Sequence, residues 1–492
     1  MIDPRAKPLF QRLFWIVAGG LVAGGIVTAE RLASVSTAAG FVIGAVALLP
    51  SYLWVRTLHG LPIYPAVSLS YLWTSAIPLI QGHLEVVRYA VTDQLLAVIT
   101  VVASLSFGTV CWASFNRRRP PARSSCLCIP ETRHATPFLV FIAAGCLFFS
   151  PLPWMFIEID GSLYSTTRMA VQALAVLSTT VVAYQWGRRT LSSLAKAVFI
   201  LLSFLSMVFE LTGLMIHPFV MLVFTSAAAY TLGRGRLPLT LIGITCVIIS
   251  LLHAGKWPMR AAYTGPHAKP VTSYVEFYTE WFAAGLQALD GSVDPDLRRP
   301  KHSSALERGS VIQMLLLVQT RSPDPVSYLY GETYALIPEL LVPRLLNPNK
   351  PWANEATHLL GMHYGLQTRA QTRTTTIGFG PLAESYANFG LLGVFGLGAA
   401  TGALTGAVAR WGTGLPVTSF NGLFGLLTLS AFLQTEGSLS AIVNSLFQGL
   451  MTLICVRVVL MRRIMVANTR VSAQSPGASA SPRTDQGVGG GR

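Results

Sequence analysis

Acidic and basic residues that suit chemistry at a hydroxyl or phosphate group gather between residues 328 and 390. This stretch holds Glu332, then Arg344 and Lys350 in the segment Pro-Arg-Leu-Leu-Asn-Pro-Asn-Lys-Pro, and finally Glu384. An arginine presents a fixed fork of donors to phosphate oxygens and never loses its charge. A carboxylate can accept a proton from a hydroxyl group. Together these residues suit a reaction in which a hydroxyl attacks and a phosphate-containing group leaves.

Motifs that would indicate a nucleotide or a metal are missing. The chain has no Walker loop and no HExxH-type spacing. Residues 378–383 loosely fit a dinucleotide fingerprint, but no strand is readable before them. Cys126 and Cys128 lack a second Cys/His pair at metal-ligand spacing. We therefore expect neither a metal nor a cofactor.

The composition indicates that lipid surrounds most of the elements that position these residues. Hydrophobic residues make up 52% of the 492 and charged residues only 12%, against about 25% charged in soluble proteins. Hydrophobic stretches of about 20 residues, enough to cross a bilayer as helix, recur along the chain. The sequence predicts an all-α polytopic membrane protein with about twelve spans, near residues 13–29, 35–55, 62–81, 94–114, 137–154, 169–186, 197–213, 215–232, 237–254, 389–409, 415–434 and 441–461.

The basic residues predict the orientation of these spans. The chain has 36 Lys and Arg against 21 Asp and Glu, a net charge of +15. Twelve spans with a cytoplasmic N-terminus place most clusters inside, including residues 117–119, 188–189 and 462–463, as cytoplasmic loops require. Both termini are then cytoplasmic. We expect the first span to be retained, although Val27-Thr28-Ala29 is an admissible signal-peptide cleavage site.

The spans divide the chain into four parts: nine spans in 1–254, a large outer loop domain in 255–388, three spans in 389–461 and a disordered cytoplasmic tail in 462–492. Within the loop, residues 274–285 follow the spacing of one helical face. Residues 311–318 and 333–346 are apolar runs too short to span. These segments are expected to lie along the membrane surface, to plug into the bundle from outside, or to pack on one another.

The stretch described first resembles the Wzy-type oligosaccharide repeat-unit polymerases of bacterial inner membranes. The resemblance rests on residues 330–334, on the Pro-Arg segment of residues 343–351, and on Gly378-Phe379-Gly380-Pro381-Leu382-Ala383-Glu384-Ser385-Tyr386-Ala387-Asn388-Phe389-Gly390. Leu61-Pro62-Ile63-Tyr64-Pro65 is also similar to that family. Asn347 departs from the pattern, because an aromatic residue is expected there.

The resemblance implies polymerisation of undecaprenyl-diphosphate-linked oligosaccharide units at the outer face of the inner membrane, without nucleic acid as a partner. Membrane lipids, a flippase and a chain-length regulator are the further partners that it implies. Glu384, Glu332 and Arg344 are the predicted catalytic residues, with His358 and His363 behind them as bases. The predicted residues for binding the diphosphate and sugar are Arg260, Arg308, Lys350, Arg373, Tyr386 and Asn388.

Other interpretations of the same residues stay open. Basic residues beside a bilayer often anchor to lipid headgroups. Glu384 suits hydrogen bonds that hold its loop to the next span, and Glu332 suits a helix N-terminus. Glu210 is expected near the outer surface or inside a cavity, because a charge facing lipid is costly. The alternative functions are a polysaccharide ligase, a transporter or flippase, and a non-enzymatic scaffold in envelope assembly.

Overall fold

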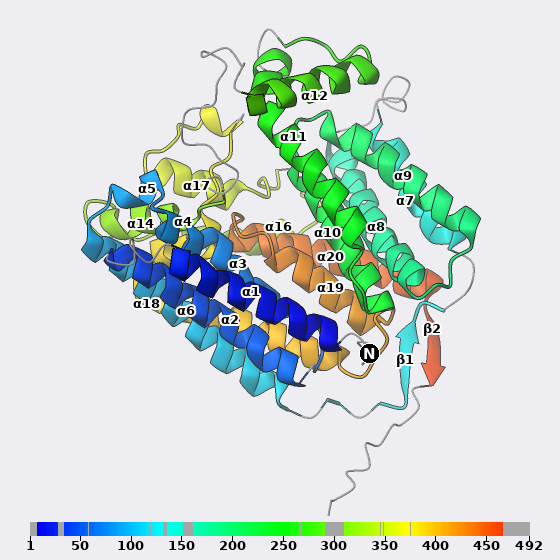
Figure 1. Cartoon of the computed structure of the whole chain (residues 1–492), viewed down its shortest axis with the longest axis horizontal. Coiled ribbons are helices and arrows are strands. Elements are labelled where there is room, and N and C mark those ends of the chain that lie inside the picture. Colours follow the sequence, from blue (N-terminus) through cyan, green and yellow to red (C-terminus); the bar gives the residue numbers. More distant parts are fainter. Residues whose placement is uncertain are drawn as a thin grey trace, which may run out of the picture.

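Helices make up almost all of the chain that the computed structural model describes (Figure 1). The structure describes residues 7–27, 34–57, 59–118, 120–121, 123–130, 135–150, 161–264, 268–290, 309–344, 346–347, 349–373 and 375–465.

The N-terminal part forms one group of neighbouring helices, drawn in blue and cyan in Figure 1. Helix α2 packs against α1, α3, α4 and α6. A π-helical turn, Leu72–Ala76, joins α3 to α4, so that Ile63–Gln81 forms one membrane-length rod. The helices of this group are α1 (Lys7–Val27), α2 (Val35–Thr57), α3 (Ile63–Tyr71), α4 (Ile77–Gln81), α5 (Leu84–Val87) and α6 (Val91–Asn116).

A second group of helices, in green tones, stands beside the first (Figure 1). Helix α8 packs on α7 and α10, and α11 packs on α12. The group consists of α7 (Thr136–Phe149), α8 (Gly161–Gly187), α9 (Ser193–Leu211), α10 (His217–Arg234), α11 (Leu239–Tyr263) and α12 (Tyr274–Asp290).

The C-terminal part runs back through both groups. Helix α18 lies along α6, and α20 contacts both α19 and α8. A short antiparallel pair of strands joins the segment after α6 to the end of α20. These elements are α14 (Ile312–Arg321), α15 (Glu332–Ala335), α16 (Ile337–Leu341), α17 (Glu355–His363), the 3-10 turn η6 (Gln371–Arg373), α18 (Gly380–Gly412), α19 (Phe420–Phe432), α20 (Leu439–Leu460), β1 (Ser125–Cys128) and β2 (Arg462–Met465).

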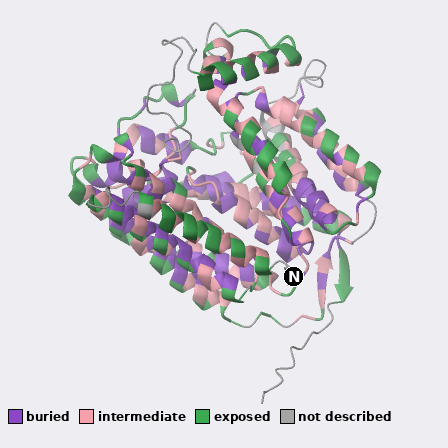
Figure 2. Cartoon of the chain, viewed as in Figure 1, coloured by how far each residue is buried: buried purple, intermediate pink, exposed green. Residues whose placement is uncertain are grey.

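The chain is a multi-pass membrane protein by the length and hydropathy of its helices. Seven helical segments are long and apolar enough to span, at Val35–Thr57, Ile63–Gln81, Val91–Asn116, Ser193–Leu211, Leu239–Tyr263, Gly380–Gly412 and Leu439–Leu460. Thr136–Phe149 and Phe420–Phe432 are apolar but shorter. Exposed residues cover much of α9 and α11 (Figure 2); they include large apolar side chains such as Phe204 and Ile244. Such surfaces suit contact with lipid.

Glycines allow α6 and α18 to approach each other closely. Gly398, Gly402 and Gly406 recur every fourth residue and therefore share one face of α18. A Cβ atom on Gly402 would lie 2.1 Å from the carbonyl oxygen of Gly108 on α6. Small residues at this spacing let membrane helices pack backbone to backbone. This contact holds α18 in place. The first turns of α18 carry Glu384 and the rest of the Gly-Phe motif from residue 380 to residue 390.

The segments of the predicted outer loop pack onto the helices around them. Leu316 and Val318 of α14 are buried in one core cluster with side chains of α2, α6 and α18. Phe277 and Trp281 of α12 are buried against α11 and the end of α9. Residues 311–318 therefore plug into the bundle, one of the arrangements expected from the sequence.

Two boundaries in the structure differ from those that hydropathy suggests. Helix α18 begins at Gly380 rather than near residue 389, and it kinks at Gly390 (φ 59°, ψ −142°). Residues 462–465, expected to open a disordered tail, form strand β2 paired with β1. The remainder of that tail, 466–492, lies outside the described residues.

Candidate functional site

The segment before α15 is tied to the first turns of α18. The backbone N–H groups of Leu329 and Tyr330 donate to the carbonyls of Ala387 and Asn388, at 2.9 and 3.1 Å. The Asn388 amide, fully buried, donates to Thr333 Oγ1 at 2.8 Å and accepts from the Gly331 N–H at 3.0 Å. Asn388, predicted to bind substrate, thus satisfies its hydrogen bonds within the protein.

Glu384 joins α18 to the start of α20. Its Oε2 atom accepts a hydrogen bond of 2.5 Å from the backbone N–H of Leu439, in the first turn of α20. A carboxylate is favourable there, because helix N-termini carry unpaired N–H groups and partial positive charge. The side chain is fully buried, and its Oε1 atom has no hydrogen-bond partner among the described residues. This geometry suits the anchoring role; the catalytic role of Glu384 stays a prediction.

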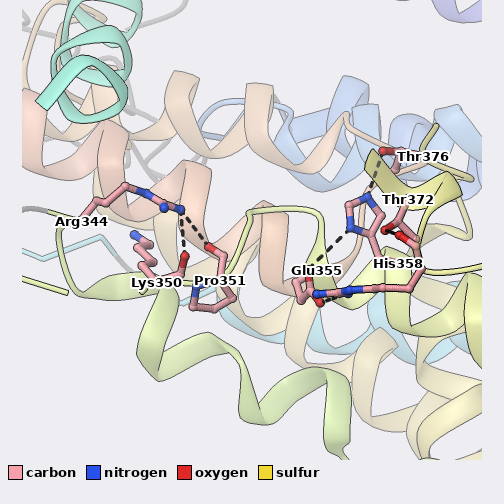
Figure 3. Close-up of polar contacts among 8 residues, drawn as sticks. Arg344, Lys350, Pro351, Glu355, His358, Thr372 and Thr376 are labelled. Carbon is pink, nitrogen blue, oxygen red and sulfur yellow. Dashed lines mark hydrogen bonds and ion pairs between the residues drawn. The ribbon is translucent and has the colours of Figure 1, made fainter. Parts of the chain in front are cut away.

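Arg344 organises the loop before α17. Its Nη2 atom donates to the carbonyl of Lys350 at 2.9 Å and lies 3.4 Å from that of Pro351 (Figure 3). Its guanidinium also lies 5.6 Å from the centre of the Trp352 ring. Partial burial, helped by the charge of Arg344, holds the pKa of Lys350 below its ordinary value. Arg344 thus places a positive charge next to Trp352, and the charge of Lys350 lies close enough to Arg344 to be affected by it.

Trp352 leads into a cavity of about 600 Å³ formed by α17, η6 and the segments beside them. Three charged side chains line it together with His358, which lies on α17. The amide of Asn354, the hydroxyl groups of Thr372, Thr375 and Thr376 and the indole of Trp352 complete the polar part of the lining. The charged side chains are Glu355, Arg369 and Arg373.

Glu355 and His358 form the centre of this cavity. They lie three residues apart on α17 and therefore on one face of the helix. His358 Nδ1 is 3.6 Å from Glu355 Oε2, and His358 Nε2 is 3.2 Å from Thr376 Oγ1 (Figure 3). The other oxygen of Glu355 pairs with Arg369 at 2.5 Å. A buried carboxylate beside an imidazole can orient the ring and stabilise its protonated form.

The charges suit an anionic ligand with hydroxyl groups. Arg369 is largely exposed although it pairs with Glu355, and Arg373 is exposed on η6. Guanidinium groups bind phosphate oxygens in a bidentate manner, and an aromatic ring such as Trp352 offers an apolar face. The cavity, here called the His358 cavity, can therefore hold a phosphate group next to a potential proton acceptor.

The structure brings together only some of the residues predicted for the site. Arg373 lines the His358 cavity, and Arg344 and Lys350 adjoin it through Trp352. The remaining predicted residues have other surroundings. Glu332 is exposed and begins α15, and buried Tyr386 packs edge-on against Tyr328. His363 Nε2 lies 2.8 Å from the Ser327 carbonyl oxygen. Arg260 lies on α11, which packs against α12 and α10, and Arg308 lies outside the described residues.

The sequence predictions did not include Glu355, Arg369 and Trp352 of the His358 cavity, nor Asn354 and Thr372. Glu355 has the spacing of one helical face with His358, which could have drawn attention to it. Arg369 and Trp352 had no such signal, because they reach the cavity through loops whose path depends on tertiary contacts.

Comparisons with known proteins add no relatives. No protein-family model matches the chain, and neither a curated protein nor a solved structure matches it.

Proposed function

We propose that this protein polymerises undecaprenyl-diphosphate-linked oligosaccharide units into a surface or secreted polysaccharide. The observation that carries the proposal is the His358 cavity, where a carboxylate–imidazole pair adjoins Arg369 and Arg373. Its residues come from the same stretch whose Pro-Arg and Gly-Phe motifs resemble polymerases of this kind. The helices of the same chain that are long and apolar enough to span a membrane supply the setting that a lipid-linked substrate needs.

In this proposal the acceptor sugar hydroxyl loses its proton to Nε2 of His358. Glu355 stabilises the imidazolium that results. The acceptor oxygen forms a bond with the anomeric carbon of the donor sugar, while the bond from that carbon to the diphosphate oxygen breaks. The leaving diphosphate keeps the electron pair. Arg369 and Arg373 stabilise its growing negative charge, with Arg344 and Lys350 close behind. No metal or cofactor takes part.

The proposal includes the finer topology. Twelve spans with both termini in the cytoplasm put residues 255–388, and so the His358 cavity, at the outer face of a bacterial inner membrane. The lipid-linked units would reach that face through a flippase, and a chain-length regulator would be a further partner. A ligase that transfers finished chains would use the same donor and similar arginines, and it is the nearest alternative; a transporter is the next.

The test is a deletion of the gene in the native host, with surface and lipid-linked glycans sized by gel and mass spectrometry. A polymerase predicts single repeat units and no long chains. Long lipid-linked chains that never reach their acceptor would instead establish a ligase, and units trapped on the cytoplasmic side a flippase. An unchanged glycan profile would remove polysaccharide assembly altogether.

Complementation of the deletion then tests the cavity. Arg369→Ala and His358→Gln should each lower polymer at least 100-fold, because removal of a charge-stabilising group or general base typically costs 10²–10⁴-fold. Arg88→Ala is the matched control, since Arg88 is exposed and contacts only side chains close to it in sequence, those of Glu85 and Tyr89, in the described part of the chain. Normal polymer from both cavity variants at normal membrane levels would refute this site.

A further inference from the structure

A second polar cavity lies inside the bundle, among α7, α8, α9, α10, α19 and α20. Its volume is about 290 Å³. The polar part of its lining consists of one carboxylate, three glutamine amides and six serine or threonine hydroxyls. The carboxylate is Glu210, and the amides are those of Gln172, Gln434 and Gln448.

Helical spacing directs these polar groups to one place. Ser203, Ser206 and Glu210 follow each other at three and four residues and share a face of α9. Ser445 and Gln448 are likewise three residues apart on α20. Two helices therefore turn polar stripes toward the same cavity.

These polar stripes are costly where they lie. Both α9 and α20 are long and apolar enough to span a membrane, and polar groups at that depth cost free energy unless they find partners. The Oε1 atom of Gln448 is buried without a hydrogen-bond partner among the described residues, while its Nε2 donates to Asn444 at 3.1 Å. Polar groups of this kind in a membrane bundle usually mark a ligand or an ion pathway.

The chemistry of the lining selects a class of ligand. Glu210 is the only charged residue among the described ones that line the cavity, so a phosphate or another anion would be repelled. The volume corresponds to about ten water molecules at ~30 Å³ each, which far exceeds one ion and approaches the range of small-molecule sites. Amides and hydroxyls both donate and accept hydrogen bonds, as the hydroxyls of a sugar require.

We infer that this Glu210 cavity binds one sugar of the oligosaccharide unit, and that the sugar is uncharged or carries an amine. The inference rests on the proposed function and deepens it. Phosphate recognition then belongs to the arginines of the His358 cavity, and sugar recognition to the Glu210 cavity.

The experiment uses the full-length protein in lipid nanodiscs. The probe is the free repeat-unit oligosaccharide, released by mild acid from the lipid of the deletion strain, with binding followed by saturation-transfer NMR. The double variant Gln434→Leu/Gln448→Leu should bind at least tenfold more weakly. Arg369→Ala should bind like the wild type, as should the matched control Glu339→Gln, which neutralises an exposed carboxylate on α16. Glu210→Gln with Ser430→Val serves as a second variant if the first does not fold.

The possible results separate the two proposals. Weakened binding in the cavity variants alone supports the inference. The inference would be overturned if the folded cavity variants bound the oligosaccharide as tightly as the wild type, or if the wild type did not bind it. In either case, loss of polymer in Arg369→Ala would leave the proposed function intact. Glycans unchanged by the gene deletion would overturn both.

Discussion

Side chains with the same chemistry carry different tasks here according to their burial. Glu384 and Glu355 are both buried carboxylates. Glu384 accepts from a backbone N–H at the start of α20, whereas Glu355 faces a cavity, an arginine and a histidine. The same contrast separates Arg344, which binds backbone carbonyls, from exposed Arg373. A carboxylate or guanidinium that opens on a cavity is available for direct contact with a substrate, whereas one bonded to the backbone first of all holds the chain in place.

Two substitutions at Glu384 separate anchoring from catalysis. Glu384→Gln keeps an oxygen that can accept from Leu439, so we expect normal membrane levels and polymer. Glu384→Ala leaves that buried N–H unpaired, which costs about 1–3 kcal/mol, and should lower the yield and melting temperature of the purified protein. If Glu384→Gln folds normally but makes no polymer, Glu384 is the base instead of His358.

The pKa of Lys350 predicts a dependence of anion binding on pH. Because partial burial and Arg344 depress this pKa, the ammonium loses its charge at a lower pH than an ordinary lysine. Affinity for inorganic pyrophosphate should therefore fall as pH rises from 7 toward 10. Lys350→Arg should remove the part of this fall that belongs to Lys350, because arginine stays charged. Titration calorimetry on both proteins gives the ratio of the pyrophosphate affinity of the wild type to that of Lys350→Arg at each pH. If this ratio does not change with pH, Lys350 does not belong to the anion site.

At the scale of elements, the α6–α18 contact positions the segment around Glu384 and Asn388. Helix α18 holds the segment that binds residues 329–333 and reaches α20 through Glu384. Its kink at Gly390 needs glycine, because φ is positive and a Cβ would lie 2.9 Å from the Tyr328 hydroxyl. The glycine-lined face beyond the kink then sets how close α6 can lie.

A pair of alanine substitutions on α18 tests this contact. Gly402→Ala places a methyl group 2.1 Å from the Gly108 carbonyl oxygen, so the helices must separate and the melting temperature should fall sharply. Gly396→Ala meets nothing within 4 Å, and alanine exceeds glycine in helix propensity by up to about 1 kcal/mol. The control should therefore be neutral or stabilising. Equal melting temperatures for the two variants would contradict close packing of α6 and α18.

At the scale of the whole molecule, the two cavities divide recognition by charge. The His358 cavity has two arginines and one glutamate in its lining, and the Glu210 cavity has a single carboxylate. Helix α20 binds Glu384 of α18 at its first turn, and farther along it carries Gln448 of the Glu210 cavity. A lipid-linked oligosaccharide has both kinds of group, a diphosphate and neutral hydroxyls, and so suits both cavities.

Cysteine labelling tests the orientation of the whole molecule. In a variant without native cysteines, Val275→Cys, at an exposed position of α12, should react with a membrane-impermeant maleimide in spheroplasts. Arg118→Cys, exposed after α6, should react only once the membrane is opened. The opposite pattern would invert the topology and place the His358 cavity in the cytoplasm.

Hydropathy suffices to predict much of the helical architecture. Runs of about 20 apolar residues predict membrane helices because the bilayer demands them locally, and the structure has helices at all twelve predicted positions, seven of them long and apolar enough to span. The stretch between residues 328 and 390 also contains Arg373 and His358, which line the same cavity. The helices depend on neighbours in sequence, so sequence alone determined them.

Only the tertiary structure decided which polar residues face one another. Glu384 is buried against α20, and Glu355 with Arg369 opens on a cavity, through contacts between segments that sequence spacing cannot place. The start of α18 at Gly380, the insertion of α14 into the core and the pairing of β2 with β1 likewise depend on partners distant in the chain. Burial and long-range hydrogen bonding, rather than residue type, assign the roles of these side chains.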